Sequence, residues 1–229
     1  MDRLHIGIAG AGRMGQAIAA AVESASDLEL AGIWQRGADL EPVVSAADVL
    51  IDFSLPEATA MVIECVERLG TPLVCGVTGL GPGQLASIEQ AARSVPVVYD
   101  RNMSPGIAVL TELAAEAAAA LGGDFSVEIH ETHHVHKIDA PSGTALKLGA
   151  AVARARGEDP AGIHYESERR GEVPGEHRVI LASATERLVL EHSVATRDVF
   201  ADGALRAARW LAGRPAGLYS MRDVLARDS

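Results

Sequence analysis

The sequence predicts an α/β protein: an N-terminal Rossmann-like, doubly wound parallel sheet, then a second α+β domain with an open, mainly antiparallel sheet. Three observations support this fold class. Up to about residue 103, apolar runs typical of buried strands alternate with stretches typical of helices. A glycine-rich turn joins the first strand to the first helix. Beyond that point, closely spaced strand-like runs replace the alternation.

The elements of the first part follow from apolar runs and helix start signals. We expect strands at residues 4–9, 28–34, 49–53, 72–75 and 95–99, and helices at 13–24, from 54 onward and at 83–93. Ser54 is placed to cap the second helix, with Pro56 in its first turn and Glu57 in position for a capping box. Right-handed crossovers put the carboxyl ends of parallel strands along one edge of the sheet.

The second part has longer helices and a different strand pattern. Helices are predicted at residues 107–121, 143–156 and 203–212, and strands at 125–131, 178–183, 187–192 and 198–200. Residues 165–176 are charged and punctuated by Gly and Pro, which predicts a loop. The tail through Val224 is expected to pack on the first domain. These boundaries assign residues 1–103 and 203–229 to a dinucleotide-binding domain, and 104–202 to a substrate-binding and oligomerisation domain.

Composition argues against several classes of protein. A formal net charge of −11 disfavours nucleic acid and anionic membranes as partners. With 48% hydrophobic and 22% charged residues, the chain is expected to be globular rather than disordered. The two cysteines, Cys65 and Cys75, lack metal-binding or redox spacing. We expect no signal peptide and no apolar segment of membrane-spanning length, and hence a cytoplasmic protein with reduced thiols.

The glycine-rich turn is Gly10-Ala11-Gly12-Arg13-Met14-Gly15. Gly10 and Gly12 permit a tight turn and a close approach of the backbone to a pyrophosphate, and the N-terminus of the following helix offers N–H groups to it. In this strand–turn–helix context the motif favours a dinucleotide site. An ordinary glycine-rich turn is the alternative.

The end of the second strand bears on the choice of cofactor. An NAD site usually places a carboxylate there for the ribose 2′-hydroxyl, whereas this chain has Gln35 followed by Arg36. Arg36, with Arg13, could pair with a 2′-phosphate, so we predict that NADPH is preferred and that NADH use is possible. A solvated surface arginine is the alternative.

A second candidate site lies between residues 130 and 145. Four of the eight histidines fall within seven residues, at positions 130, 133, 134 and 136, and Lys137 follows. His133, His134 and His136 with Glu131 could ligate zinc, but the ammonium of Lys137 opposes a divalent cation, so we expect no metal. On a strand, His134 and His136 would share a face that His133 and Lys137 do not. Packed or surface histidines without a chemical role are a further alternative.

An acid–base role accounts for more of these residues together. Histidine donates protons most readily near neutral pH, and Lys137 supplies a positive charge for a carboxylate. Ser142, Gly143 and Thr144 are expected at a helix start, where hydroxyl and backbone N–H groups bind anions. Two separate anion sites suggest a small dicarboxylate substrate, and a nicotinamide beside this pocket would favour hydride transfer coupled to protonation.

The segment Glu131–Ala145 resembles the signature of the dihydrodipicolinate reductase family, also called 4-hydroxy-tetrahydrodipicolinate reductase. The resemblance extends over almost the whole chain. Further matching segments are Gly12-Arg13-Met14-Gly15, Ile51-Asp52-Phe53-Ser54, Gly76-Val77-Thr78-Gly79, Arg101-Asn102-Met103-Ser104, Gly175-Glu176-His177 and residues 217–225. The resemblance implies reduction of a cyclic imine dicarboxylate with NAD(P)H on the diaminopimelate route to lysine.

The resemblance also implies roles for individual residues. His133 resembles the catalytic acid/base and Lys137 a second proton donor, while His134, Gly143 and Thr144 resemble substrate-binding residues. The implied cofactor contacts are Gly10, Ala11, Gly12, Arg13, Met14, Arg36, Gly76, Val77, Thr78, Asp100, Arg101, Asn102 and Met103. Family members are typically homotetramers assembled through the second sheet, and exposed strands in residues 178–201 fit that assembly.

This chain departs from the family pattern in five places. Its glycine-rich turn is one residue shorter, Gln35 replaces a frequent acidic residue, and Met103 stands where an aromatic residue is often found. The chain is short between Arg36 and Val49 and around residues 171–175. Two alternatives to the family activity stay open: a reductase of another cyclic imine or keto dicarboxylate, and a catalytically inactive NADPH-binding sensor.

Overall fold

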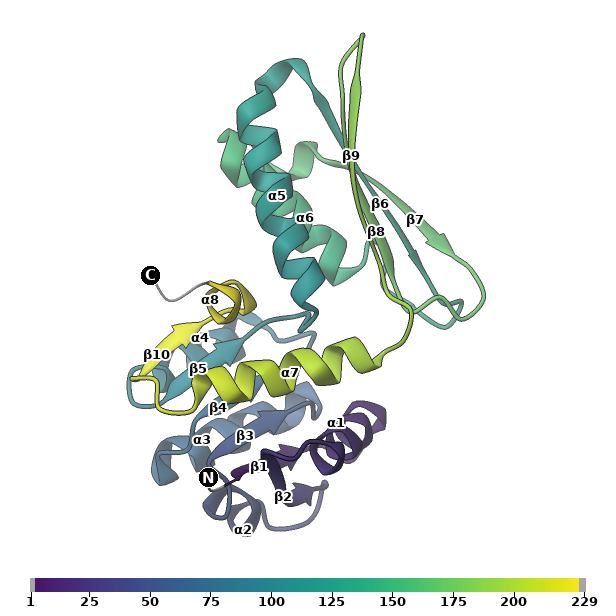
Figure 1. Cartoon of the computed structure of the whole chain (residues 1–229). Coiled ribbons are helices and arrows are strands. Elements are labelled where there is room, and N and C mark those ends of the chain that lie inside the picture. The colour runs from purple at the N-terminus through teal and green to yellow at the C-terminus, as the bar shows by residue number, and fades with distance from the viewer. Residues whose placement is uncertain (1–2, 227–229) are drawn as a thin grey trace. The chain divides into compact units, whose positions relative to one another are not determined.

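The computed structural model describes residues 3–226, which form two compact units (Figure 1). The first unit contains the residues up to Ser104 together with those from Asp198 onward. The second unit is Pro105–Arg197. The chain thus returns to the first unit at Asp198, ahead of the predicted position 203, because a helix begins there.

The first unit is built around a sheet of six parallel strands. The strands are β1 (Leu4–Ala9), β2 (Leu28–Trp34), β3 (Val49–Asp52), β4 (Leu73–Cys75), β5 (Pro96–Tyr99) and β10 (Gly217–Tyr219). Their order is β10-β5-β4-β3-β1-β2. The chain therefore leaves β1 in one direction to form β2 and returns on the other side as β3, which creates the switch point where such sheets bind ligands. The strand β10 comes from the C-terminal tail, which packs on this unit as predicted.

Helices cover both faces of this sheet, which confirms the doubly wound fold. Helices α1 (Arg13–Ser24) and α7 (Asp198–Leu211) contact each other, and α8 (Met221–Leu225) contacts α7. The remaining helices are α2 (Glu41–Ser45), α3 (Thr59–Leu69) and α4 (Pro82–Ala91). Buried side chains of α3 and α4, such as Val62 and Ile88, form one apolar cluster with Leu50, Leu73 and Val97 of the sheet.

The second unit is a mixed four-stranded sheet with helices on one face (Figure 1). Its elements are α5 (Pro105–Leu121), β6 (Ser126–His133), α6 (Gly143–Arg156), β7 (His164–Arg169), β8 (Glu176–Ala182) and β9 (Arg187–Ser193), with 3-10 turns at Gly122–Asp124 and Pro160–Gly162. The order is β7-β6-β8-β9, and only the β6–β7 pairing is parallel. Ile129, Leu148 and Val179 are fully buried between the sheet and its helices.

Three predictions of secondary structure are wrong. Residues 198–200 begin α7 rather than a strand, because its buried Ala201, Ala204 and Leu211 recur at helical spacing. The predicted loop 165–176 contains β7, whose side chains are mostly charged and exposed, so it lacks the apolar alternation of a half-buried strand. Ser54 does not cap a helix: a 3-10 turn, Pro56–Ala58, precedes α3.

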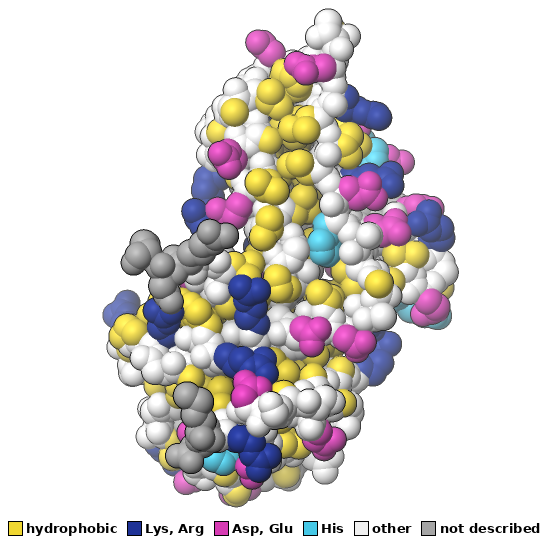
Figure 2. Space-filling view, in the orientation of Figure 1, with side chains coloured by type: hydrophobic (Ala, Val, Ile, Leu, Met, Phe, Trp, Pro, Cys, Tyr) yellow, Lys and Arg dark blue, Asp and Glu magenta, His cyan; other side chains and the backbone are white. Residues whose placement is uncertain are grey.

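One helical segment, Pro105–Asp124, has the length and apolar composition of a membrane span, so the expectation that no segment reaches that length is wrong. Two facts favour a core helix. One side of α5, including Ile107 and Ala114, packs against α6 and the sheet. The other side carries Glu112 and Glu116 together with the exposed Val109 and Leu113. Figure 2 shows a band of hydrophobic side chains over the part of the second unit where Figure 1 draws α5, with charged side chains on either side of the band.

Candidate active site

The glycine-rich turn has the geometry of a phosphate-binding loop. Gly10 has a φ of +109°, a value that L side chains rarely adopt, and a Cβ added at Gly15 would lie 1.8 Å from the Gly10 carbonyl oxygen. By contrast, a Cβ added at Gly12 would meet no described atom within 4 Å. Gly12 is the N-cap of α1 and offers no side-chain cap, so the helix N-terminus fits an anion such as a pyrophosphate.

The other predicted cofactor residues follow carboxyl ends of neighbouring strands. Gly76, Val77 and Thr78 come directly after β4, and Asp100–Met103 come after β5. A Cβ added at Gly76 would lie 2.4 Å from the Phe53 ring, so the loops after β3 and β4 are packed closely. Thr78 and Arg101 are exposed, whereas Asp100 and Met103 are buried. The sheet therefore brings these loops to the same edge as Gly10.

Arg36 lies at this edge as well, just beyond the end of β2. Its side chain is exposed and pairs with Glu57 at 3.7 Å. The geometry leaves the guanidinium accessible to a ligand, but a carboxylate competes for it. Glu57 was predicted only as part of a capping box, so its position beside Arg36 is new.

Asp52, at the end of β3, is a buried carboxyl group at the same edge. Burial raises its pKa to about 6. Its Oδ1 accepts the N–H of Ser54 at 2.8 Å, and Oδ2 has no hydrogen-bond partner among the described residues. A carboxyl group in these surroundings stays partly protonated near neutral pH.

The second candidate site is built around Glu131 and His133, which are next-but-one neighbours on β6 and share its buried face. The Glu131 side chain is completely buried and that of His133 nearly so. His133 Nδ1 contacts Glu131 Oε2, and Arg169 binds both Glu131 oxygens at 3.0 Å. The β6–β7 pairing places Arg169 directly beside His133 in the register, which explains how this arginine reaches the site.

Helix α6 starts against the same group. Ser142 is its N-cap: the Ser142 hydroxyl accepts the Ala145 N–H, and the Ser142 N–H donates to Glu131 Oε1 at 3.2 Å. The Ser142 hydroxyl also lies 3.4 Å from His177 Nε2, and the His177 ring packs edge-on against that of His133. Gly143 and Thr144 open α6, as the sequence predicts.

Lys137 lies in the loop between β6 and α6, beyond the end of the strand. Its Nζ is 2.7 Å from Asp139 Oδ1. The backbone of Gly143 bonds Asp139 too, and together these bonds outweigh partial burial and keep the pKa of Asp139 low. A carboxylate of the chain itself thus sits between Lys137 and the start of α6, the two groups predicted to bind anions.

Protonation of the two buried histidines is opposed by their surroundings. Burial lowers the pKa of His133, and Lys137 and Arg169 act in the same direction, while Glu131 acts against them. Burial, with His133 nearby, lowers the pKa of His177 to about 3. For Glu131, bonds from Arg169, Ser167 and His133 outweigh burial and keep its pKa low. The resting pair is therefore a neutral imidazole and a carboxylate.

The other two histidines after β6 lie outside the buried group, and their rings, those of His134 and His136, are 6.1 Å apart between centroids. Because β6 ends at His133, the expected shared strand face of His134 and His136 does not form. His136 is exposed and pairs with Glu172, while His134 is partly buried. Among residues 3–226, no group of three or more His, Cys, Asp or Glu side chains is placed to hold a metal ion.

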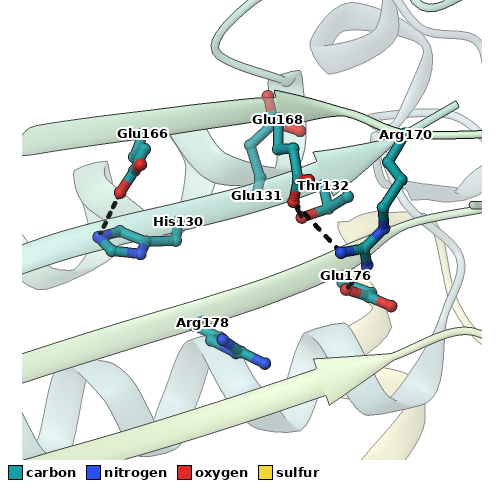
Figure 3. Close-up of a pocket in the computed structure, with 8 residues that line it drawn as sticks. All are labelled: His130, Glu131, Thr132, Glu166, Glu168, Arg170, Glu176 and Arg178. Carbon is teal, nitrogen blue, oxygen red and sulfur yellow. Dashed lines mark hydrogen bonds and ion pairs between the residues drawn. The ribbon is translucent and has the colours of Figure 1, made fainter. Parts of the chain in front are cut away.

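His130 belongs to a separate hollow on the open face of the mixed sheet (Figure 3). There His130 bonds Glu128 on its own strand and Glu166 on the neighbouring β7. The hollow is lined by His130, Glu131, Thr132, Glu166, Glu168, Arg170, Glu176 and Arg178. Figure 3 shows Arg170, Glu168 and Glu176 gathered at one end of it. His133 and Lys137 do not line this hollow.

Sequence reasoning missed Arg169 and His177 as parts of the site. Arg169 lies in the segment predicted as a loop, and its partner Glu131 is 38 positions away in the chain, so no local pattern connects them. The one available signal was chemical: a carboxylate at a buried strand position requires a cation or several donors. The residue pattern alone gives Glu131 only the role of a possible zinc ligand.

Comparisons with known proteins support the family resemblance found in the sequence. The family described as dihydrodipicolinate reductase, N-terminus, matches residues 4–103, and its C-terminal counterpart matches residues 106–225. The 4-hydroxy-tetrahydrodipicolinate reductase of Alkalilimnicola ehrlichii is 43% identical and covers 98% of this chain and 94% of its own. That of Zymomonas mobilis is 44% identical over 97% of both chains.

Solved structures show the same fold. The dipicolinate-bound dihydrodipicolinate reductase from Paenisporosarcina sp. TG-14 has a TM-score of 0.81 at 22% identity, covering 97% of this chain and 100% of that one. The diaminopimelate (DAP) dehydrogenase of C. glutamicum, in complex with DAP, has a TM-score of 0.63 at 13% identity, covering 100% and 97%. With both halves of its sequence matched, this chain belongs to the dihydrodipicolinate reductase family.

Proposed function

We propose that this protein reduces 4-hydroxy-tetrahydrodipicolinate to tetrahydrodipicolinate with NAD(P)H, on the diaminopimelate route of lysine biosynthesis. One observation carries the proposal furthest: Lys137 and the start of α6 hold a carboxylate, that of Asp139, within the same short segment as the buried His133. The identity of the substrate comes from the names of the relatives. The arrangement adds a chemical reason, since groups that hold a carboxylate can also hold one of a dicarboxylate substrate.

In this proposal His133 and Lys137 move protons, and His134, Gly143 and Thr144 bind the substrate. Its two carboxylates would be held by Lys137 and by N–H groups at the start of α6. A bound dicarboxylate would also offset the effect of burial on His133 and favour its imidazolium form, which Glu131 already stabilises. The protonated ring or Lys137 could then deliver a proton to the reduced substrate.

The cofactor would bind along the carboxyl edge of the parallel sheet. Gly10–Met14 would receive the pyrophosphate, and the loops at Gly76–Thr78 and Asp100–Met103 would line the rest of the site. When bound, NAD(P)H supplies the hydride. Because Gln35 is neutral and Arg36 is exposed, we propose that NADPH is preferred, with NADH still accepted.

We further propose a cytoplasmic homotetramer that uses the open face of the mixed sheet. That face carries charges of both signs, among them His130, Glu166, Arg170 and Arg178, and it can therefore meet a second copy of itself. Neither nucleic acid nor membrane is a proposed partner, since the net charge of −11 disfavours both.

The test is NADPH oxidation by the purified protein with enzymatically generated 4-hydroxy-tetrahydrodipicolinate. We expect turnover that saturates with substrate and is inhibited by pyridine-2,6-dicarboxylate. A panel of other cyclic imines and keto dicarboxylates separates this activity from that of a related reductase. A folded sample that binds NADPH and turns over none of these substrates would instead identify a sensor.

A further inference from the structure

Arg169 uses all of its hydrogen-bonding capacity inside the protein. A guanidinium has five N–H donors. Nε donates to the Lys137 carbonyl at 3.2 Å, one terminal nitrogen to Glu131 Oε2 and the Glu168 carbonyl, and the other to Glu131 Oε1 and the Asp139 carbonyl. No donor remains for a substrate carboxylate. This arginine lies beside the candidate site, but all of its donors bind groups of the protein rather than a ligand.

The groups that Arg169 binds are the ones on which the proposed chemistry depends. Its bonds to the Lys137 and Asp139 carbonyls fix the loop that carries the Lys137 ammonium. Its two bonds to Glu131 fix the carboxylate that contacts His133. An adjacent backbone hydrogen bond, from the Arg170 N–H to the His133 carbonyl at 2.8 Å, further joins the ends of β6 and β7.

Glu131 in turn has a defined acceptor pattern. Oε1 receives the Ser142 N–H and one Arg169 nitrogen, while Oε2 receives the other Arg169 nitrogen and faces His133 Nδ1. A carboxylate only accepts hydrogen bonds, so Nδ1 must carry the proton. The lone pair of the neutral ring is then on Nε2. This atom lies beside Gly175, and a Cβ added to that glycine would be 3.2 Å from it.

We propose that Glu131 and Arg169 form a positioning pair: Glu131 fixes His133 as the Nδ1–H tautomer with Nε2 available to the substrate, and Arg169 anchors both Glu131 and the Lys137 loop. Neither residue touches substrate in this account. The inference deepens the proposed function, and its kinetic consequence rests on that function. Its structural consequence, the tautomer of His133, does not.

The test is the 15N chemical shifts of the imidazole rings in the full-length protein, with His133 assigned from the signal lost in His133→Gln. We expect Nδ1 of wild-type His133 to be protonated and Nε2 unprotonated at neutral pH. In Glu131→Gln, the amide oxygen should take the Oε1 place, because both donors there, the Ser142 N–H and an Arg169 nitrogen, are fixed, whereas one of the two at Oε2 is the His133 proton, which can move. The amide NH2 then faces Nδ1 and donates to it, so the proton should move to Nε2.

Glu168→Gln is the matched control. Glu168 is the chain neighbour of Arg169 and is half-exposed, and it bonds Thr132 Oγ1 at 3.1 Å and Arg170 on the open face of the sheet (Figure 3). The same chemical change there should leave the His133 tautomer unchanged. A protonated Nε2 in wild-type protein would overturn the proposal without reference to any variant, and so would an unchanged tautomer in Glu131→Gln.

Kinetics supply the second readout. If the wild-type protein is the proposed reductase, Glu131→Gln should lower kcat by ~10²-fold or more, within the range of acid–base effects, and shift the pH profile, with little change in KM. Arg169→Lys keeps the charge but loses the fork, and should lower kcat too. A wild-type protein that is inactive but has the Nδ1–H tautomer would refute the proposed reductase activity and leave the positioning pair of Glu131 and Arg169 supported.

Discussion

The two candidate sites owe their geometry to different parts of the chain, the backbone in one and side chains in the other. At the edge of the parallel sheet, the geometry comes from the backbone: Gly10, Gly12 and Gly15 shape a turn whose ligand-facing side is open. At the end of the mixed sheet it comes from buried side chains, in which Glu131, His133 and Arg169 hold one another. A backbone site tolerates the loss of an exposed side chain, whereas a side-chain network fails when one charge is removed.

This difference explains what the sequence could predict. The parallel sheet, its helices and the glycine-rich turn follow from local patterns, and the structure confirms the fold class. The helix at Gly143–Arg156 begins and ends where it was predicted, because Ser142 and Gly157 mark its ends. The same holds for the family, since its signature is a contiguous segment.

The network could not be predicted because its key contact is non-local. Arg169 reaches Glu131 only because β7 pairs with β6, and β7 has too few buried apolar residues to be recognised as a strand. Ser54 is a different case: it has the sequence context of a cap, but its N–H is bound by the local Asp52 side chain, and a 3-10 turn precedes α3. There a competing local turn, rather than a tertiary partner, decides the structure.

The largest effect should come from breaking the network. Arg169→Ala leaves the buried Glu131 carboxylate without its arginine partner, which should lower the free energy of unfolding by about 3–5 kcal/mol. Urea unfolding monitored by circular dichroism measures this. Arg3→Ala removes an arginine from an exposed pair with Glu29 in the parallel-sheet unit and should change little. Equal effects of the two substitutions would remove the distinction between the sites.

The next effect is the pH dependence of stability contributed by His177. Burial lowers its pKa from 6.5 to about 3, so only the unfolded chain takes up a proton between these values. The free energy of unfolding should therefore fall below pH 6.5, by about 2 kcal/mol at pH 5 for this group, at ~1.4 kcal/mol per pH unit. His177→Gln should lose that part of the dependence, and His164→Gln, at an exposed position, should keep it. A variant His177→Gln with the wild-type pH dependence would contradict the account.

A substitution in the glycine-rich turn should change NADPH affinity rather than the free energy of unfolding. In Gly12→Ala the added methyl meets no described atom, so stability should stay near that of the wild type, while NADPH affinity drops by about tenfold or more because the methyl lies where the pyrophosphate is proposed to bind. Fluorescence titration with NADPH measures it. Gly83→Ala, at another helix start with free space around it, is the control. Undiminished affinity in Gly12→Ala would exclude this turn from the cofactor site.

The smallest effect concerns the exposed pair beyond β2. Arg36→Ala should weaken NADPH binding by about tenfold, as expected for one exposed charge-assisted contact, and leave NADH binding unchanged. Glu57→Gln removes the competing carboxylate and should move NADPH affinity slightly the other way. Isothermal titration with both cofactors distinguishes these outcomes. A parallel loss for NADH and NADPH would mean that Arg36 does not read the 2′-phosphate.

The central claim is that the buried end of the mixed sheet, rather than the glycine-rich edge, performs the proton chemistry. The most direct measurement is steady-state reduction of 4-hydroxy-tetrahydrodipicolinate by His133→Ala. We predict that kcat falls by ~10²–10⁴-fold while KM and NADPH affinity stay near their wild-type values, because the imidazole acts mainly in the transition state. A near-normal kcat in a folded, NADPH-binding variant would contradict the claim.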